Sequence, residues 1–176
     1  MFWTTVALIP FLAIATWTDI RRQMIYNWTM YPAILVGIAA NVIVFREEGL
    51  RDSLTGLAVC GAIAVVCFVF LPDLGGGDVK LVAALGAGLG FRDGFEAMLW
   101  TFVIGMTMAM AILICQNGAW TLLTKALRRI GHVLRGGRGV PVKEEDRKML
   151  QQPLFLAPSA LIALFVVRWS ELLAGP

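Results

Sequence analysis

The sequence has little charge and few of the residues from which soluble catalytic sites are usually built. Only 15% of its 176 residues are charged and 59% are hydrophobic, whereas soluble domains are about a quarter charged and about half apolar. This departure toward apolar residues indicates an integral membrane protein. Because a transmembrane helix needs roughly 20 apolar residues, we expect about six spans in one membrane-embedded domain, residues 1–176.

Histidine and cysteine are too scarce to indicate metal or disulfide chemistry. The chain has one histidine, His132, and its three cysteines form no CxxC pair. We therefore expect no metal site, no cofactor and no disulfide framework. The cysteines are interpreted as small buried hydrophobic residues, and the serines have no histidine base near them. The cysteines are Cys60, Cys67 and Cys115, and the serines are Ser53, Ser159 and Ser170.

A small positive net charge does not point to nucleic acid here. The formal net charge is +3 and the pI is about 9.0. No basic stripe is interleaved with aromatic residues, as a nucleic-acid surface would require. The excess of cations is better explained by cytoplasmic loops of a membrane protein.

Six apolar segments predict an all-α fold with about six transmembrane helices. The fourth segment follows a glycine-rich turn and is short, because about 13 residues cover roughly 20 Å of a roughly 30 Å hydrocarbon core. A half-helix or re-entrant element would need cover from the other helices, and Gly86 and Gly90 form a GxxxG pair suited to close packing. The segments are about residues 2–18, 28–45, 53–71, 79–91, 95–115 and 153–169.

The distribution of lysine and arginine favours six crossings with both termini outside. Cytoplasmic loops carry an excess of these residues. With the N-terminus outside, eleven of the 15 cations fall in inside loops, and the bias reverses if the fourth segment does not cross. The inside cations are Arg21, Arg22, Lys80, Lys125, Arg128, Arg129, Arg135, Arg138, Lys143, Arg147 and Lys148. The outside cations are Arg46, Arg51, Arg92 and Arg168.

Residues 116–152 form the one long loop, which this topology assigns to the cytoplasm. Its first part, Trp120 to Leu134, combines apolar residues with Lys125, Arg128 and Arg129. Such a segment suits an interfacial helix on anionic lipid. We therefore predict a basic cytoplasmic loop, partly an interfacial helix, with membrane lipids as partners.

Two acidic residues lie where predicted helices meet the cytoplasmic face. Asp19 ends the first span, and Asp78 opens the fourth directly after three glycines, residues 75–77. An acidic residue at a membrane boundary is costly and is a functional candidate, and successive glycines let an extended peptide approach closely. Two structural explanations stay open: Asp78 as the cap of its helix N-terminus, and Asp19 as an interfacial charge beside two arginines.

Two carboxylates that face one water can hydrolyse a peptide bond without an activated nucleophile. The ionised carboxylate takes a proton from water, and the protonated one polarises the scissile carbonyl. Two neighbouring carboxylates resist joint ionisation, so they titrate in two macroscopic steps. We therefore predict Asp19 and Asp78 as the catalytic pair.

The residues around Asp78 are assigned supporting roles. Gly75 and Gly77 are expected to shape the turn, together with Lys80. Residues two apart on a helix do not face each other, so Lys80 is interpreted first as a positive-inside anchor and second as a modifier of the aspartates. Asp73 lacks the glycine setting and is ranked below Asp78.

The segment from Gly75 to Lys80, with residues 81–86 after it, resembles the GxGD motif of type IV prepilin peptidases. Asp19 and the residues up to Asn27 resemble the first aspartate segment of that family, with Tyr26 where the family usually has proline. Residues 153–159 are similar to the Pro-Phe-x-x-Pro start of the family's last helix. The resemblance covers nearly the whole chain in order and spacing.

The resemblance implies an aspartic endopeptidase that removes the short basic leader of type IV (Flp-like) prepilins and pseudopilins, for pilus assembly or secretion. It implies the short form of the family, which serves Flp-type or Tad-type pili and lacks the cysteine-containing region linked to N-methylation. The expected location is the bacterial cytoplasmic (inner) membrane, with several spans and the active site, Asp19 and Asp78, on the cytoplasmic side. The substrate helix of a prepilin is the expected partner.

Three other interpretations stay open. Asp19 and Asp78 could bind ions in a small transporter or channel. A GxGD protease of the presenilin type cuts within membrane spans, but those enzymes have tyrosine before the first aspartate, where this chain has Thr18. A non-catalytic subunit of a pilus-assembly machine would keep its function after loss of both carboxylates.

Overall fold

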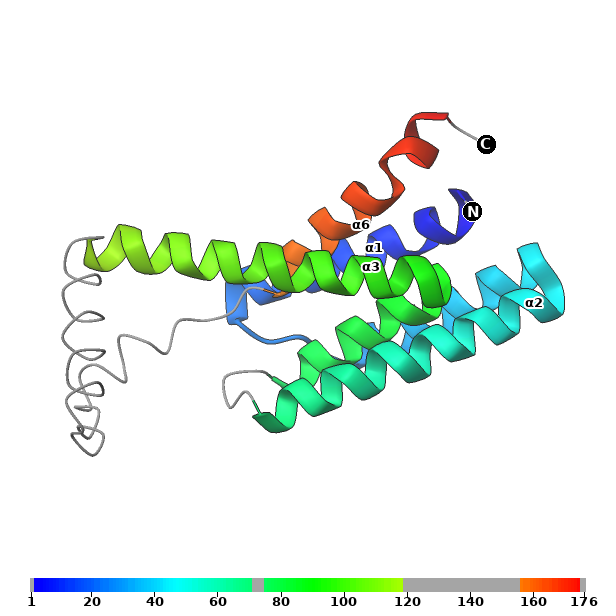
Figure 1. Ribbon diagram of the computed structural model, residues 1–176, viewed down its shortest axis with the longest axis horizontal. Helices are drawn as coiled ribbons and strands as arrows, with labels where there is room; N and C mark the ends of the chain where they lie inside the picture. The colour runs from blue at the N-terminus through cyan, green and yellow to red at the C-terminus, as the bar shows by residue number, and fades with distance from the viewer. Residues whose placement is uncertain (1, 71–74, 119–155, 175–176) are drawn as a thin grey trace, which may run out of the picture. The chain divides into compact units, whose positions relative to one another are not determined.

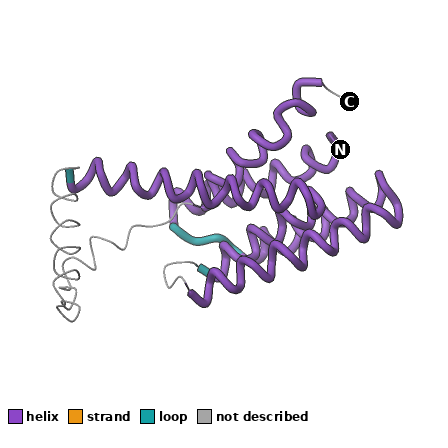
Figure 2. The backbone as a smooth tube through the Cα atoms, in the orientation of Figure 1, coloured by secondary structure: helices purple, strands orange, loops and turns teal. Residues whose placement is uncertain are grey.

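The structure is a computed structural model that describes residues 2–70, 75–118 and 156–174, which are helical apart from short connections (Figure 1; Figure 2). Two compact units divide the chain, Met1–Gly105 with Leu154–Pro176 and Met106–Pro153, and the candidate site residues belong to the first. The helices are α1 (Phe2–Arg22), α2 (Asn27–Phe70), α3 (Gly76–Asn117) and α6 (Leu156–Ala174).

Both long helices reverse direction at a single residue. The helical path breaks in α2 at Arg46 (φ 55°, ψ −127°) and in α3 at Gly90 (φ 82°, ψ −176°). Each helix therefore has two limbs: residues 27–45 and 47–70 of α2, and residues 76–89 and 91–117 of α3. Within the first compact unit, Figure 1 shows these limbs folding back. With α1 and α6, these limbs match the six predicted apolar segments in order.

The prediction of a helical membrane protein is confirmed for the part of the chain that the structure describes. Three helices are long and apolar enough to cross a membrane, namely Trp3–Arg22, Asn27–Phe70 and Gly76–Cys115, and α6 contributes a shorter apolar stretch, Leu156–Trp169. Six crossings with both termini outside stay a prediction. The loop proposed as an interfacial helix, His132 and Asp73 lie outside the described residues.

The first limb of α3 lies at the centre of the packing. Its residues 81–90 are almost all buried. Glycines on both limbs of α2 let the backbones approach, since Gly37 meets Gly88 and Gly56 meets both glycines of the GxxxG pair. The close packing predicted for that pair is confirmed, and the short fourth segment is covered by other helices.

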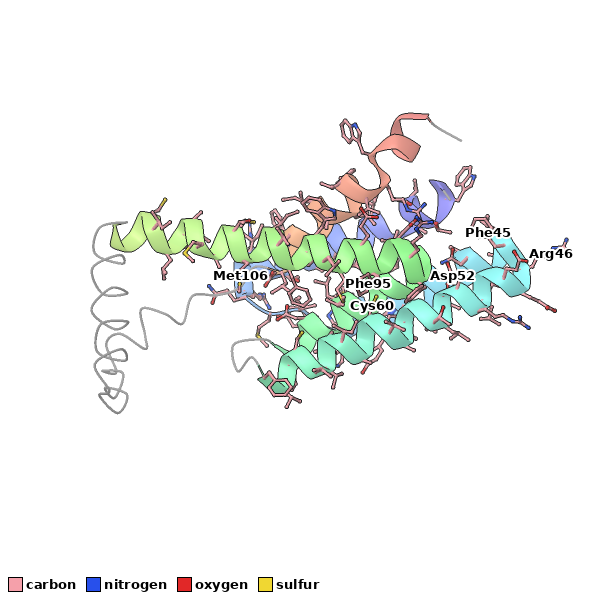
Figure 3. All side chains as sticks on the ribbon, in the orientation of Figure 1. Phe45, Arg46, Asp52, Cys60, Phe95 and Met106 are labelled. Carbon is pink, nitrogen blue, oxygen red and sulfur yellow. The ribbon has the colours of Figure 1, made fainter. Side chains whose placement is uncertain are left out.

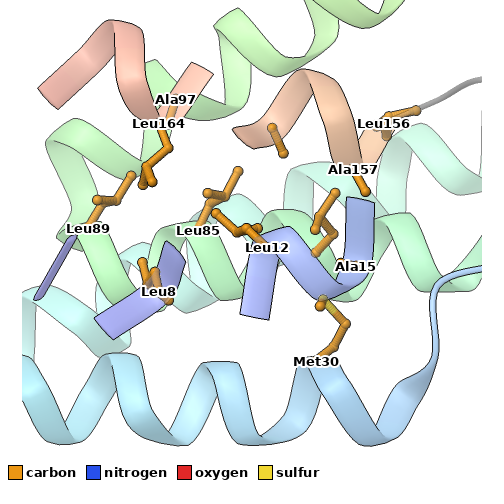
Figure 4. Packing of buried hydrophobic residues seen from close by; sticks show 12 residues of the cluster. Leu8, Leu12, Ala15, Met30, Leu85, Leu89, Ala97, Leu156, Ala157 and Leu164 are labelled. Atoms are coloured by element: carbon orange, nitrogen blue, oxygen red, sulfur yellow. The ribbon is translucent and has the colours of Figure 1, made fainter. Parts of the chain in front are cut away.

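α1 and α6 pack against this limb through one apolar cluster (Figure 4). Lipid tails are as apolar as leucine, so within a membrane such a cluster is held by close van der Waals packing rather than by exclusion of water. Its alanines keep α1 and α6 close together. The fully buried members include Leu8, Leu12 and Ala15 of α1, Leu81, Leu85 and Leu89 of α3, and Leu156, Ala157, Ala160 and Leu164 of α6.

The cysteines only partly follow the expectation of burial. Cys60 is buried in a second apolar cluster with Val82 and Met98, and Phe95 packs against that cluster (Figure 3). Cys67 is half-buried. For Cys115 the expectation is wrong, because that residue is exposed.

The reversal of α3 exposes backbone groups that side chains of α2 satisfy. The last-turn carbonyls of a helix have no partner within it, and here Asn41 Nδ2 donates to the carbonyls of Ala87 (3.2 Å) and Gly88 (2.9 Å). The first N–H groups of the next limb are orphaned in the same way, and Asp52 Oδ1 accepts the N–H of Phe91 at 3.0 Å. Figure 3 shows Asp52 beside this reversal.

Arg168 of α6 joins the same polar group and corrects one prediction. Its Nη2 atom lies 2.6 Å from Asp93 Oδ2 and 3.4 Å from the carbonyl oxygen of Leu89. The side chain of Arg168 is 3% exposed and that of Asp93 is 28% exposed. Arg168 was predicted to be a cation of an outside loop; it lies instead inside the bundle, because α3 supplies its carboxylate partner. The positive-inside bias keeps its direction without it.

Candidate active site

Asp19 lies in the last turn of α1, on the face that packs into the bundle. Leu12 and Ala15, the preceding residues on this face, belong to the buried cluster, and Asp19 itself is 6% exposed. Its Oδ2 atom accepts the backbone N–H of Ala157 at 3.2 Å. Ala157 is the second residue of α6, where N–H groups lack partners within the helix and the dipole is positive. The carboxylate of α1 thus caps α6.

The two arginines after Asp19 make contacts of their own. The Arg21 guanidinium stacks over the Trp17 ring at 4.3 Å from its centroid, and Arg22 Nη1 donates to the Tyr26 hydroxyl at 2.9 Å. Both arginines are exposed whereas Asp19 is buried. Asp19 is therefore not the interfacial charge beside two arginines that the second structural explanation described.

Asp78 lies in the first turn of α3 and is hydrogen-bonded to Gly75, at the start of the glycine turn. Its Oδ2 atom accepts the N–H of Gly75 at 2.8 Å, and its own N–H donates to the Gly75 carbonyl at 3.0 Å. This reciprocal pair is the pattern in which a side chain at the third helical position caps the start of its helix. Asp78 is therefore a helix cap, as one explanation proposed, and it is also 9% exposed.

The fold brings the two carboxylates together from separate helices. Asp19 and Asp78 interact electrostatically, and each comes from the end of its helix that lies beside the α1–α2 junction, residues 23–26. Only Oδ2 of each carboxylate accepts a hydrogen bond from the described residues. The Oδ1 atom of each carboxylate is therefore not engaged by these residues.

The glycine turn shows why its positions are not equivalent. A Cβ on Gly77 would lie 2.8 Å from the Cβ of Ile25 and 3.0 Å from its carbonyl oxygen, so no side chain fits there. A Cβ on Gly75 would lie 3.3 Å from Asp78 Oδ2, whereas one on Gly76 would meet nothing within 4 Å. Space for a side chain is therefore restricted at residues 75 and 77 and open at residue 76, which matches the pattern Gly-x-Gly-Asp.

Lys80 faces α2 rather than Asp78. Its Nζ atom donates to Asn27 Oδ1 at 2.7 Å and lies 5.0 Å from the centroid of the Tyr31 ring. The prediction that Lys80 does not face Asp78 agrees with these partners. Its partners on α2 were not predicted, since nothing in the sequence pairs residue 80 with residue 27.

Two further contributors could not be found from the sequence. The N–H of Ala157 is a backbone group, so no side-chain pattern marks it. The close approach of Ile25 to Gly77 depends on how the α1–α2 junction turns, and Gln23 takes a positive φ of 51° there. For the contact with Ile25, the available sequence signal is Gly77 itself. A glycine at this position indicates a close neighbour but does not identify the residue.

Comparison with known proteins assigns the chain to a family. Residues 6–110 match the model of the type IV leader peptidase family. This range covers more than half of the chain and includes Asp19, the glycine turn and Asp78. The chain therefore belongs to the type IV leader peptidase family, and the predicted family is confirmed. Comparison with curated proteins and with solved structures gives no match.

Proposed function

We propose that the protein is a prepilin leader peptidase that uses Asp19 and Asp78 as an aspartic catalytic pair. The observation that carries the proposal is that two buried carboxylates, Asp19 of α1 and Asp78 of α3, lie at the two helix ends joined by the contact of Ile25 with Gly77. Membership of a leader peptidase family supports a peptidase with prepilin-type substrates. The aspartic mechanism and the Flp-like substrate class are the parts that we add.

The chemistry needs one proton shared between the two carboxylates. The ionised aspartate removes a proton from water, the water oxygen bonds to the scissile carbon, and the protonated aspartate gives its proton to the carbonyl oxygen. The tetrahedral diol then collapses. The C–N bond breaks, the amine leaves with the proton taken from water, and the second aspartate recovers its proton from the diol. The scheme is balanced with either aspartate as the initial base.

The hydrogen bonds of the site support this scheme. Each aspartate has one oxygen held by a backbone N–H, at 3.2 Å for Asp19 and 2.8 Å for Asp78, which fixes the orientation of both carboxylates. Fixed groups need little reorganisation when the substrate arrives. No nucleophilic side chain is required, since water is the nucleophile.

The position of the pair at helix ends suits the expected substrate. Asp19 lies in the last turn of α1 and Asp78 in the first turn of α3, so both lie near an end rather than the middle of these apolar helices. A prepilin carries a short basic leader ahead of an apolar helix. We propose that the apolar helix stays in the bilayer while the leader remains in the cytoplasm, so that the bond to be cut reaches the depth of the two aspartates.

The proposal is tested by reconstituting the purified protein in liposomes with a prepilin from a candidate Flp-type pilus. Mass spectrometry would follow release of the leader and locate the cut. Cleavage at one bond ahead of the apolar helix supports the proposal. Absence of cleavage with every prepilin tried, together with ion flux through the same liposomes, would favour the transporter interpretation instead.

A further inference from the structure

We propose that Lys80 is a positioning residue of the peptidase, which fastens the turn carrying Asp78 to the first turns of α2. The proposal rests on the proposed function, because it concerns the geometry of the same aspartate pair. It specifies, by its contacts, the supporting role expected for Lys80 at the turn.

The contacts of Lys80 are those of a fastened side chain. Its ammonium donates to Asn27 Oδ1 at 2.7 Å and lies over the Tyr31 ring at 5.0 Å. Asn27 and Tyr31 are one helical turn apart, so they present one face of α2 to the ammonium. An amide oxygen and a ring face are both attractive to a cation. A lysine acting only as an interfacial anchor would extend its ammonium into water. The ammonium of Lys80 instead bonds to Asn27 at the surface of the protein, with the lysine side chain half-buried.

The α1–α2 junction is the element that connects the two aspartates. On one side, the N–H of Gln23 donates to the carbonyl of Asp19 at 2.8 Å, which continues α1 into the junction. On the other side, Ile25 lies directly against Gly77. A change in the position of this junction relative to the glycine turn therefore changes the separation of the two carboxylates.

Gly77 and Lys80, on opposite flanks of Asp78, contact the junction and the start of α2 respectively. Gly77 precedes the aspartate and makes the apolar contact, and Lys80 follows it and makes the polar one. With the hydrogen bond of Lys80 removed, the start of α3 keeps the contact of Gly77 with Ile25 but loses its polar attachment to α2. We expect Asp78 then to occupy a wider range of positions around Asp19.

The expected effect is on turnover rather than on substrate binding. Misplacement of a catalytic group by about 1 Å costs roughly 100-fold in rate, so Lys80→Met should lower kcat by about 10- to 100-fold. KM should change by less than about threefold, because no contact with substrate is removed. Lys80→Arg keeps a donor and a cation, and should retain more of the activity than Lys80→Met.

A double-mutant cycle separates positioning from other roles. If Lys80 acts through Asn27, the loss of kcat in the Lys80→Met, Asn27→Ala double variant should equal that of the worse single variant. Multiplied losses, or a rise in KM without a fall in kcat, would overturn the proposal. Arg21→Met is the matched control, since it removes an exposed cation from the end of α1 that adjoins the α1–α2 junction. An equal loss of kcat in this control would show that charge at the interface, and not position, is what matters.

A second measurement does not depend on activity. Hydrogen exchange in wild type and Lys80→Met should be faster in the variant for both residues 23–31 and residues 75–80, with the rest of the described helices unchanged. Unchanged exchange in both segments would overturn the proposal even if no prepilin were cut. If wild type cuts prepilin while Lys80→Met cuts at the same kcat, this inference fails and the proposed function stands.

Discussion

Asp19 accepts the backbone N–H of Ala157 across 138 residues of sequence, so one of the two candidate catalytic carboxylates also holds the start of α6. The same division applies to Asp78, which caps α3 through Gly75. Each aspartate therefore combines a capping role with its proposed catalytic role. A substitution that tests catalysis must keep the capping hydrogen bond. Asparagine does this, because its carbonyl oxygen can still accept a backbone N–H while its charge is gone.

The capping role of Asp19 predicts different stabilities for two substitutions. Asp19→Ala removes the acceptor for Ala157 and should lower stability by about 1 kcal/mol, the usual cost of losing a helix cap. Asp19→Asn should stay close to wild type. Thermal unfolding of both variants in detergent checks this. Equal destabilisation of the two would mean that the charge itself, and not the acceptor, holds α6.

The glycine turn predicts that Gly77→Ala is damaging and Gly76→Ala is not. A Cβ at residue 77 would lie 2.8 Å from the Cβ of Ile25 and 3.0 Å from its carbonyl oxygen. A backbone atom cannot turn aside as the end of a side chain can, so the glycine turn must move. Overpacking of this kind costs about 1–3 kcal/mol, and we expect prepilin cleavage to fall by at least about tenfold because Asp78 moves with the turn.

Gly76→Ala is the matched control, since its Cβ would meet nothing within 4 Å. Cleavage rates of the two variants at equal protein levels make the comparison. Similar rates in both variants would contradict the steric account of the turn. Ile25→Ala should not rescue Gly77→Ala, because alanine keeps the Cβ and the carbonyl that cause the collision.

The ion pair of Arg168 and Asp93 predicts an asymmetry between its two halves. Asp93→Ala takes the carboxylate from a guanidinium that is 3% exposed, and breaking a buried pair in this way costs about 3–5 kcal/mol. Arg168→Met leaves behind a carboxylate that is 28% exposed and better able to remain hydrated, so it should cost less. Unfolding midpoints of both variants in one detergent provide the test. Greater damage from Arg168→Met would contradict this asymmetry.

Asn41 is predicted to stabilise the reversal of α3. Asn41→Leu removes the donor to the carbonyls of Ala87 and Gly88, and hydrogen bonds between membrane helices are worth about 0.6–1.7 kcal/mol. We expect a loss of about 1–2 kcal/mol for the two bonds. Ile43→Ala is a control on the same limb, because Ile43 is 80% exposed and faces away from the bundle. An equal loss of stability in Ile43→Ala would mean that any substitution on this limb of α2 destabilises the protein, and that the amide of Asn41 has no special role.

The helices and the aspartates could be predicted from the sequence because each has a local signal. Apolar length marks a helix in lipid, and an acidic residue beside glycines at a membrane boundary is costly enough to indicate function. The reversals were harder to predict. Residues 47–52 are rich in charge and lie between two predicted segments, but they are helical, since exposed charges at the end of a limb do not break a helix.

Long-range pairing was the part that local patterns could not supply. Local patterns pair neither Arg168 with Asp93 nor Lys80 with Asn27. The same holds for the cap of α6, since Ala157 carries no polar side chain. Each of these contacts joins distant segments, and packing of whole helices decides which residues meet.

The most direct test of the central claim is prepilin cleavage by Asp19→Asn and Asp78→Asn, each beside wild type at equal levels in the membrane. Both substitutions keep an acceptor for the capping N–H and remove the carboxylate. The aspartic pair predicts that each variant folds and accumulates normally while leader release falls below detection. Cleavage at the wild-type rate by either variant would contradict the pair, and would leave that residue as a helix cap alone.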